Sequence, residues 1–506
     1  MTQRLTLLPA HHALYLLKCS MGPVRMIYRL RTARCYLQTE FLRQFDKMII
    51  DCLSRITNVN ITEAIWMQAA LPVAQGGLGI RSIEKLALPT FLASAYSVAK
   101  LTNELVDFDP EIYCRGAAEE WQQMTKADLP AFETRKHQKI WDEPIIHGTV
   151  ETLLAAAQSD MSSEARLRGV STKDNGAWLE ALPAASLGNF LNDTTLRIAV
   201  GLRLGVPVTI PHRCNCGEWA DARGYHGLSC KKSRRRKPRH SCINVTLKRA
   251  FASAGIETEL EPSALQRSRK LRPVRSELIN FSPNPVRLRI FKIILRPLRS
   301  VNVFYKSESS PIRSENFCHI YFLFHSRKIY NTYTIRLEPP GTCLTNGKRP
   351  DGVTLVPWER GKMLTWDATC VCTVALSHIA ATSKQAGAAA ARAEQDKVAK
   401  YRELTRDYLF RAFGVETLGP LGPDASHLVT EVGKMIQQET GEVRATEFLR
   451  QRISIDVQRG NAASVMGTAP ASANLDEMFC VIRPPISVRQ IELKMHLCTS
   501  ADSIHP

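Results

Sequence analysis

The sequence contains no run of apolar residues that approaches the length needed to span a bilayer, although apolar residues fill 44% of its 506 positions. Its first residues, Met1 to Arg4, lead into a segment holding His11, His12 and Lys18 rather than into an apolar core with a cleavage site. The 14 cysteines stand at irregular spacing, which favours a reducing compartment over a disulfide framework. We therefore expect a nuclear or cytoplasmic protein that is neither secreted nor held in a membrane.

Acidic residues are scarce in two stretches, and these account for the whole net charge of +19. Residues 266–337 contain 15 Lys or Arg against three acids, and residues 231–240 contain seven Lys or Arg and no acid. The seven cations are Lys231, Lys232, Arg234, Arg235, Arg236, Lys237 and Arg239. Such a run can neutralise the phosphates of nucleic acid, serve as a nuclear-import signal, or be a solvated linker. We predict nucleic-acid contact and import, which are compatible.

The longer basic stretch also lacks helical or strand periodicity. Residues 266–337 read as Arg, Ser, Pro, Asn and scattered aromatics between Glu261-Pro262 and Glu338-Pro339. A long segment of this kind inside a compact domain is uncommon. We interpret it as an insertion foreign to the fold, disordered and translated from non-coding sequence. An evolved basic arm is the alternative.

Soft metal ligands cluster just before the shorter basic run. Cys214 and Cys216 are separated by nine residues from His226, and Cys230 follows four positions later. Three sulfurs and one imidazole form a standard tetrahedral set for structural zinc, and the intervening loop is short enough to close it. The sequence predicts a zinc module here, with Cys242 as a spare ligand. Four unrelated residues in a reduced protein, three cysteines and a histidine, are the plain alternative.

Two aspartates stand at the edges of β-like runs. Asp351 precedes a predicted strand at 353–356, residues 357–361 are a predicted turn, and a return strand at 363–374 contains Asp367. Across such a hairpin the two carboxylates can converge on magnesium, which binds through one or two carboxylates plus water and phosphate oxygens. A turn aspartate and a solvated strand residue are the alternative.

The first hundred residues carry helical periodicity. Apolar residues step by threes and fours along one face, at Leu37, Phe41, Phe45, Met48, Ile49, Cys52, Leu53 and Ile56. A second helix is predicted from Ile61 to Leu71, with Asn60 as its cap. Pro72 ends that helix, and the glycines of residues 75–80 predict a turn or loop.

The aspartate pair resembles the PD-(D/E)xK nuclease core. Pro350-Asp351 supplies the first half and Asp367 the second, whereas the lysine usual two positions later is replaced by Thr369. In some branches of that family the lysine is relocated, and the Ala-rich helical stretch around Glu394 offers Lys397 or Lys400. The resemblance implies catalytic Asp351 and Asp367 with magnesium, and one of these lysines as the third group. Solvated helix-face charges are the alternative for both lysines.

Several short blocks together resemble the C-terminal part of a non-LTR retrotransposon reverse transcriptase protein. These are Leu71 to Ser82, the Cys/His cluster, Arg239-His240, Arg349-Pro350-Asp351, Trp366 to Thr369, Lys400-Tyr401, Glu416 to Gly419 and Gln458 to Ala462. The match covers roughly residues 5–100, 200–262 and 338–468. It implies a helical thumb-like region followed by a zinc module and a restriction-enzyme-like endonuclease. The family's polymerase uses Tyr-x-Asp-Asp, which occurs nowhere in this chain, so no polymerase activity is expected.

The predicted organisation is a mixed α/β or α+β protein built from several parts. These are a helical thumb-like region at 1–100, a helical connector at 101–200, the zinc module with its basic run at 201–242, a mixed-sheet nuclease core at 243–265 and 338–468, the insertion at 266–337, and a tail at 469–506. The expected function is magnesium-dependent nicking of DNA, with structural zinc and with DNA or the element's own RNA as partner. Two alternatives stay open, a non-catalytic nucleic-acid-binding remnant and a gene-model product without function. The sequence leaves the oligomeric state unknown.

Overall fold

The computed structural model describes residues 2–106, 109–172, 174–233, 237–260, 349–470 and 478–479. They belong to one compact unit formed by Met1–Ser263 with Cys343–Pro506. The predicted insertion at 266–337, the cations Arg234, Arg235 and Arg236, and most of the predicted tail lie outside the described residues.

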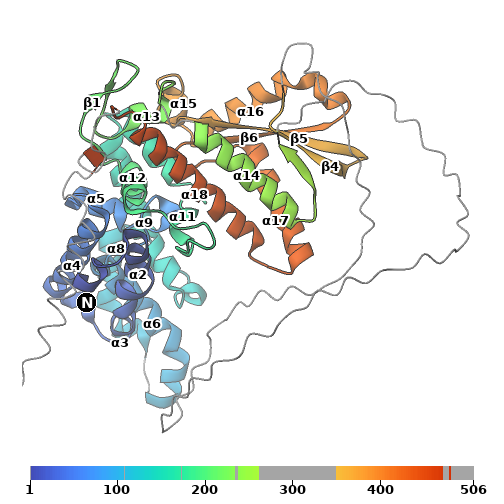
Figure 1. Cartoon of the computed structure of the whole chain (residues 1–506). Helices are drawn as coiled ribbons and strands as arrows, with labels where there is room; N and C mark the ends of the chain where they lie inside the picture. The colour runs from blue at the N-terminus through green and yellow to red at the C-terminus, as the bar shows by residue number, and fades with distance from the viewer. Residues whose placement is uncertain are drawn as a thin grey trace, which may run out of the picture. The chain divides into compact units, whose positions relative to one another are not determined.

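The first two hundred residues are helical, as predicted (Figure 1). The predicted first region holds α1 Thr2–Leu5, α2 Ala10–Leu16, α3 Ile27–Thr32, α4 Thr39–Thr57, α5 Glu63–Ala69 and α6 Ile83–Val106. The connector holds α7 Pro110–Tyr113, α8 Arg115–Thr125, α9 Gln138–Ala157, α10 Met161–Val170, α11 Ala177–Glu180 and α12 Asp193–Leu204. Among the described residues, none of the helices combines the length and apolar character that crossing a membrane requires.

The prediction of which residues of α4 are buried is confirmed for its C-terminal half and wrong for the residues before it. Ile49, Cys52, Leu53 and Ile56 are buried, but Leu37, Phe41 and Met48 are exposed. The buried stripe instead begins with Leu42 and Asp46. Asp46 turns inward because it accepts hydrogen bonds from the Ser82 hydroxyl at 2.5 Å and from the Ile83 N–H at 2.9 Å at the start of α6.

The second predicted helix is shorter than expected and has a different cap. Helix α5 begins at Glu63, and the Thr62 hydroxyl, not Asn60, accepts the Ile65 N–H. After Pro72 comes a short 3₁₀ turn, Val73–Gln75, and then the predicted glycine loop. Gly77 packs so tightly that a Cβ there would lie 2.0 Å from the Leu71 carbonyl oxygen.

A four-stranded mixed sheet forms the second part of the fold. Its strands, in spatial order, are β3 Thr258–Leu260, β4 Gly352–Glu359, β5 Lys362–Val371 and β6 Leu409–Glu416. The first three pair antiparallel, whereas β5 and β6 are parallel. The β4–β5 hairpin turns at Arg360 and Gly361, both with positive φ, so the predicted turn at 357–361 is too long. A primed two-residue turn of this kind fits the right-handed twist of the strands.

The strands on either side of the predicted insertion are direct neighbours. Leu260, at the end of β3, pairs in register with Gly352, at the start of β4. The chain therefore leaves the sheet and re-enters it at adjacent positions, as expected for a hairpin with a long connection between its strands.

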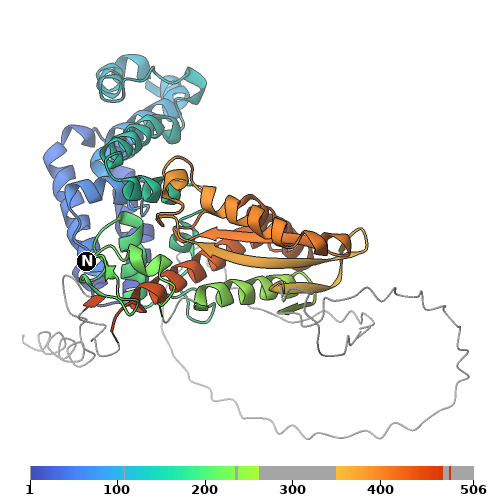
Figure 2. The same cartoon turned by 90° about the horizontal axis from the view of Figure 1, so that it is seen from above.

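Helices cover both faces of the sheet. On one face, apolar residues of α14 Lys237–Ser253, α17 Pro423–Thr440 and α18 Ala445–Met466 form a core with Leu364, Trp366, Ala368, Phe413 and Val415. Helix α16 Ala388–Lys400, which follows α15 Ile379–Thr382, contacts β5 and β6 on the other face (Figure 2). The fold class is thus mixed α and β with a small mixed sheet.

The Cys/His segment forms a small module beside α18. It contains the hairpin of β1 His212–Arg213 and β2 Trp219–Ala220, followed by α13 Tyr225–Ser229. Helix α14 then runs through the predicted boundary at residue 242. The module and the sheet core therefore share one continuous helix.

Candidate functional site

Asp351 and Asp367 lie side by side at the β4–β5 pair. Gly352, next to Asp351, is the register partner of Trp366, and the Asp351 N–H donates to the Trp366 carbonyl at 2.9 Å. Trp366 and Ala368 fill the core under α14. Because side chains alternate along a strand, Asp367 faces α16. The hairpin therefore brings Asp351, just before β4, next to Asp367 in β5.

His240 of α14 and the backbone of β5 fix the Asp351 carboxylate. Its Oδ2 lies 2.8 Å from His240 Nε2 and accepts the Ala368 N–H at 2.7 Å. Burial favours the neutral form of Asp351, but the hydrogen bond and charge of His240 outweigh it and lower the pKa of the carboxyl group. The same hydrogen bond raises the pKa of His240. The pair is a partly buried, charge-assisted contact.

Two residues of the α16 segment hold Asp367, whose side chain is only 4% exposed. Lys397 Nζ donates to Oδ1, and the Tyr401 hydroxyl lies 2.5 Å from Oδ2. That hydroxyl also lies 2.7 Å from the Arg349 carbonyl oxygen, and its single proton can serve only one of the two acceptors at a time. Burial, and then the hydrogen bond to Asp367, raise the pKa of Tyr401.

The two predicted lysines have different partners. Lys397 reaches the carboxylate of Asp367, whereas Lys400 Nζ donates to the Tyr401 hydroxyl at 2.9 Å. Thr369, at the position where the family usually has its lysine, lies in β5 and is the register partner of Gly414 in β6. Glu394, on the same helix, is buried and accepts the Gly414 and Ala425 N–H groups at 3.0 and 2.9 Å. Glu394 therefore holds α17 to the sheet.

His240 and Tyr401 are the site residues that sequence reasoning missed. Both lie in blocks that resemble the retrotransposon family, Arg239-His240 and Lys400-Tyr401. Tyr401 follows Lys397 by four positions, which places the two side chains on one helix face. The pairing of His240 with Asp351 spans 111 positions. No local pattern in a single sequence encodes a contact of that length.

The aspartate pair meets some requirements of a divalent-cation site. Two neighbouring carboxylates supply the hard oxygen ligands that magnesium prefers. However, Asp351 already faces His240, and Asp367 already faces Lys397 and Tyr401. A cation would have to share these oxygens with protein donors, which a carboxylate with about four lone-pair sites allows.

The predicted zinc ligands come together in the structure. One ligand atom from each of Cys214, Cys216, His226 and Cys230 lies within 4.8 Å of the others, so the four residues could hold a metal ion. Cys214 Sγ and Cys230 Sγ are 3.7 Å apart, and Cys216 Sγ is 3.3 Å from His226 Nε2. Around a tetrahedral ion with metal–sulfur bonds of about 2.3 Å, sulfurs are expected roughly 3.8 Å apart.

Local hydrogen bonds shape the Cys/His cluster. The Cys214 N–H donates to the Glu218 carbonyl and the Gly217 N–H to the Cys214 carbonyl, which closes the first loop. The Asp221 carboxylate accepts the His226 N–H at 2.9 Å and so begins α13. Burial raises the pKa of the Cys214 thiol to about 12. Cys242, the predicted spare ligand, lies in α14 outside the cluster.

The described cations of the basic run differ in their exposure to solvent. Lys231 and Lys232 are exposed. Arg239 is only 2% exposed, and its guanidinium donates to Asn461 Oδ1 at 2.5 Å and to the Leu228 carbonyl at 3.3 Å. The prediction that Arg239 binds nucleic acid is therefore wrong, because its charged group is buried between α14 and α18. Lys237 begins α14.

Two other family-like blocks also have structural roles. Asn461, from the block in α18, accepts from Arg239 and donates to the Thr417 carbonyl at 2.5 Å. Glu416, from the block that ends β6, accepts the Ala389 N–H of α16 at 3.0 Å. These contacts hold α14, α16 and α18 around the sheet.

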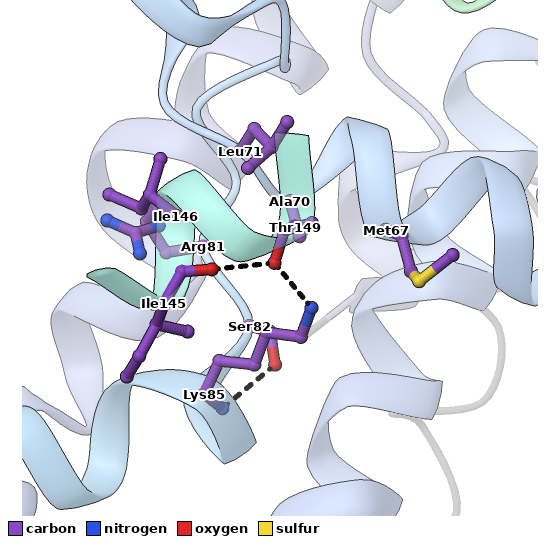
Figure 3. A pocket seen from close by; sticks show the side chains of 9 residues that line it. All are labelled: Met67, Ala70, Leu71, Arg81, Ser82, Lys85, Ile145, Ile146 and Thr149. Carbon is purple, nitrogen blue, oxygen red and sulfur yellow. Dashed lines mark hydrogen bonds between the residues drawn. The ribbon is translucent and has the colours of Figure 1, made fainter. Parts of the chain in front are cut away.

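A polar cluster joins α6 to α9 and lines a cavity of about 10 Å³, room for roughly one water molecule (Figure 3). Arg81 pairs with both oxygens of Asp142 at 2.6 and 2.7 Å. Lys85 and Thr149 point toward one another, with 3.2 Å between Nζ and Oγ1, and burial lowers the pKa of Lys85. A cavity of this size fits a role in packing rather than in ligand binding.

No protein-family model matches this chain, and no curated protein gives a significant match to its sequence.

Proposed function

We propose that this chain is related to the C-terminal region of non-LTR retrotransposon reverse transcriptase proteins. In this proposal the β3–β6 sheet with α14 and α16 is a PD-(D/E)xK-like core that nicks DNA with magnesium. The thumb-like helices and the Cys/His module would help to hold nucleic acid. Polymerase activity is not part of the proposal, because Tyr-x-Asp-Asp is absent from the sequence.

The observation that carries this proposal is the contact between Lys397 and Asp367. The family pattern needs a lysine close to the second acid, and Thr369 leaves its usual position without one. Lys397 brings an ammonium group to the same carboxylate from the neighbouring helix. This contact supports Lys397, rather than Lys400, as the relocated third group.

The residues divide the proposed chemistry among them. A divalent cation held by Asp351 and Asp367 would stabilise charge on the phosphate and lower the pKa of the attacking water. Lys397 would orient that water beside Asp367. His240 and the Ala368 N–H hold Oδ2 of Asp351, which would turn the other oxygen toward the cation.

Zinc is the proposed occupant of the Cys/His cluster. Three thiolates and an imidazole in tetrahedral arrangement are typical of structural zinc sites, whose four protein ligands leave no open position. Binding there would tie the β1–β2 hairpin to α13 and to Cys230 directly after it, since binding free energy at such sites contributes to folding free energy.

A non-catalytic, zinc-containing remnant that binds nucleic acid is the second candidate. The hydrogen bonds that His240 makes to Asp351, and that Lys397 and Tyr401 make to Asp367, favour this candidate. Two carboxylates that each face a cationic side chain carry little uncompensated charge to attract magnesium. In this alternative, Lys397 and His240 would be structural replacements for a lost metal.

A plasmid assay separates the two candidates. Purified full chain, loaded with zinc, is incubated with supercoiled plasmid in magnesium, manganese or calcium, and open circles are quantified. The nuclease proposal predicts weak nicking in magnesium and manganese, none in calcium, and none for Asp351→Asn or Asp367→Asn. Retardation of DNA in gels without any nicking would instead support the remnant.

The same assay distinguishes the two lysines of α16. Lys397→Ala should abolish nicking while leaving DNA retardation unchanged. Lys400→Ala should reduce nicking less, because Lys400 contacts Asp367 only through the Tyr401 hydroxyl. Equal loss in both variants would contradict the role assigned to Lys397.

A further inference from the structure

The β1–β2 hairpin presents a tryptophan to solvent. Trp219 is 63% exposed, whereas Trp66, Trp121, Trp141, Trp178 and Trp366 are each 9% exposed or less. The hairpin projects beside α13 (Figure 1). An exposed indole leaves a large flat apolar surface in water, and such rings are enriched where proteins bind partners.

A cation lies beside this ring, and two more are exposed in the same module. Exposed Arg213 is the cross-strand register partner of Trp219, so the two side chains lie on one face of the hairpin. Exposed Lys231 and Lys232 directly follow Cys230, whose sulfur lies 3.7 Å from that of Cys214. The Cys/His cluster thus brings the backbone just before Lys231 close to Cys214, the residue that follows β1. Glu218 is an exposed acid in the same hairpin.

The other acid of the module is engaged elsewhere. Asp221 accepts the N–H groups of Tyr225 and His226 at the start of α13. The module therefore carries three exposed cations, Arg213, Lys231 and Lys232, against one exposed acid, Glu218. That balance is complementary to a polyanion rather than to an acidic-and-basic protein surface.

We propose that Trp219 is a stacking platform for a base of single-stranded nucleic acid, with Arg213, Lys231 and Lys232 contacting the adjacent phosphates. A flat ring beside an arginine, on a module with further exposed lysines, suits a chain of bases and phosphates, since aromatic stacking tolerates any base and arginine adds cation–π attraction. The bases of a duplex are stacked on one another and cannot lie on the indole. The site depends on the metal-held hairpin but not on cleavage at Asp351 and Asp367.

Fluorescence anisotropy on the full-length, zinc-loaded protein tests this proposal. The probes are a labelled oligothymidylate of about 20 nucleotides, an abasic strand of equal length and charge, and the corresponding duplex. Trp219→Ala should weaken binding to oligothymidylate about tenfold, the loss typical of one stacked base. Binding to the abasic strand should change by less than about twofold, because that strand has no base to stack.

Matched variants separate stacking from charge and from folding. Trp219→Phe should restore most of the affinity, because phenylalanine keeps an aromatic face. Phe132→Ala, which removes a 61% exposed ring between α8 and α9, should leave binding unchanged. The triple variant Arg213→Ala, Lys231→Ala, Lys232→Ala should weaken binding to every probe and reduce the salt slope by about 2, near 0.7 for each lost single-strand phosphate contact.

Three outcomes would overturn the proposal. The first is that the wild-type protein fails to bind the oligothymidylate, which would mean that Trp219 does not bind single-stranded nucleic acid. The second is that Trp219→Ala weakens the abasic strand as much as the oligothymidylate. The third is that neither Trp219→Ala nor Trp219→Phe differs from wild type. Because no probe is cleaved in magnesium-free buffer, a failure of the nuclease proposal would leave this result unaffected.

Discussion

Replacing Lys397 with methionine should destabilise the protein by leaving the Asp367 carboxylate without its cationic partner. Asp367 is 4% exposed in its side chain, and removing one member of a buried pair typically costs about 3–5 kcal/mol. Two features reduce that cost here. The Lys397 side chain is 24% exposed, so water already screens the pair, and Tyr401 can still donate to Oδ2. We therefore expect a loss of about 2 kcal/mol.

The matched control lies on the same helix. Arg392 pairs with Asp396, but their side chains are 72% and 66% exposed, so Arg392→Met should cost no more than about 0.5 kcal/mol. Thermal unfolding in zinc-containing, magnesium-free buffer should show a fall in Tm of about 4 °C for Lys397→Met and almost none for Arg392→Met. Adding Asp367→Asn to Lys397→Met should recover much of the loss, because no unpaired charge remains buried. Equal Tm values for the two methionine variants would refute the assigned pairing.

Other parts of the fold give further predictions. Cys216→Ser should lose the zinc that we expect at one per chain and lower the Tm by several degrees, whereas Cys242→Ser should retain the metal by elemental analysis. Gly77→Ala should prevent soluble expression, since its Cβ would lie 2.0 Å from a carbonyl oxygen, whereas Gly116→Ala in α8, with nothing within 4 Å, should be neutral or stabilising. Because the pKa of His240 is raised and that of Asp351 is lowered, their ion pair stabilises the fold fully between the ordinary aspartate pKa of 3.8 and the ordinary histidine pKa of 6.5. This stability is lost as the pH rises through the pKa of His240 or falls through the pKa of Asp351. His240→Gln should therefore lower the Tm more at about pH 5.5 than at about pH 9, and the opposite order would contradict this assignment. Arg239→Met should lower the Tm, while Lys231→Ala with Lys232→Ala should leave it unchanged, because only Arg239 is buried.

The sequence predicted the features that depend on neighbours along the chain. The β4–β5 hairpin, the adjacency of Asp351 and Asp367, and the Cys/His cluster all lie within short stretches whose turns and alternation limit the possible geometry. Even there, the turn was placed too early, because Pro357 is accommodated at an irregularity within β4 rather than ending the strand.

Features set by distant contacts could not be predicted from the sequence. Asp46 of α4 points inward because its carboxylate accepts hydrogen bonds from Ser82 and Ile83, which are 36 and 37 positions away. Arg239 looked like part of a solvated basic run, but Asn461 accepts its guanidinium across 222 positions. In both cases the partner determines which face of the helix is buried, and periodicity alone does not identify that partner.

The central claim is that Asp351 and Asp367 share one divalent cation, and manganese binding tests it most directly. Titration of the zinc-loaded full chain with manganese, followed by electron paramagnetic resonance of the free ion, gives the number and affinity of sites without relying on cleavage. We predict one site that disappears in both Asp351→Asn and Asp367→Asn and persists in Arg392→Met. A titration in which wild type binds no manganese, or in which the two asparagine variants bind it as wild type does, would contradict the claim.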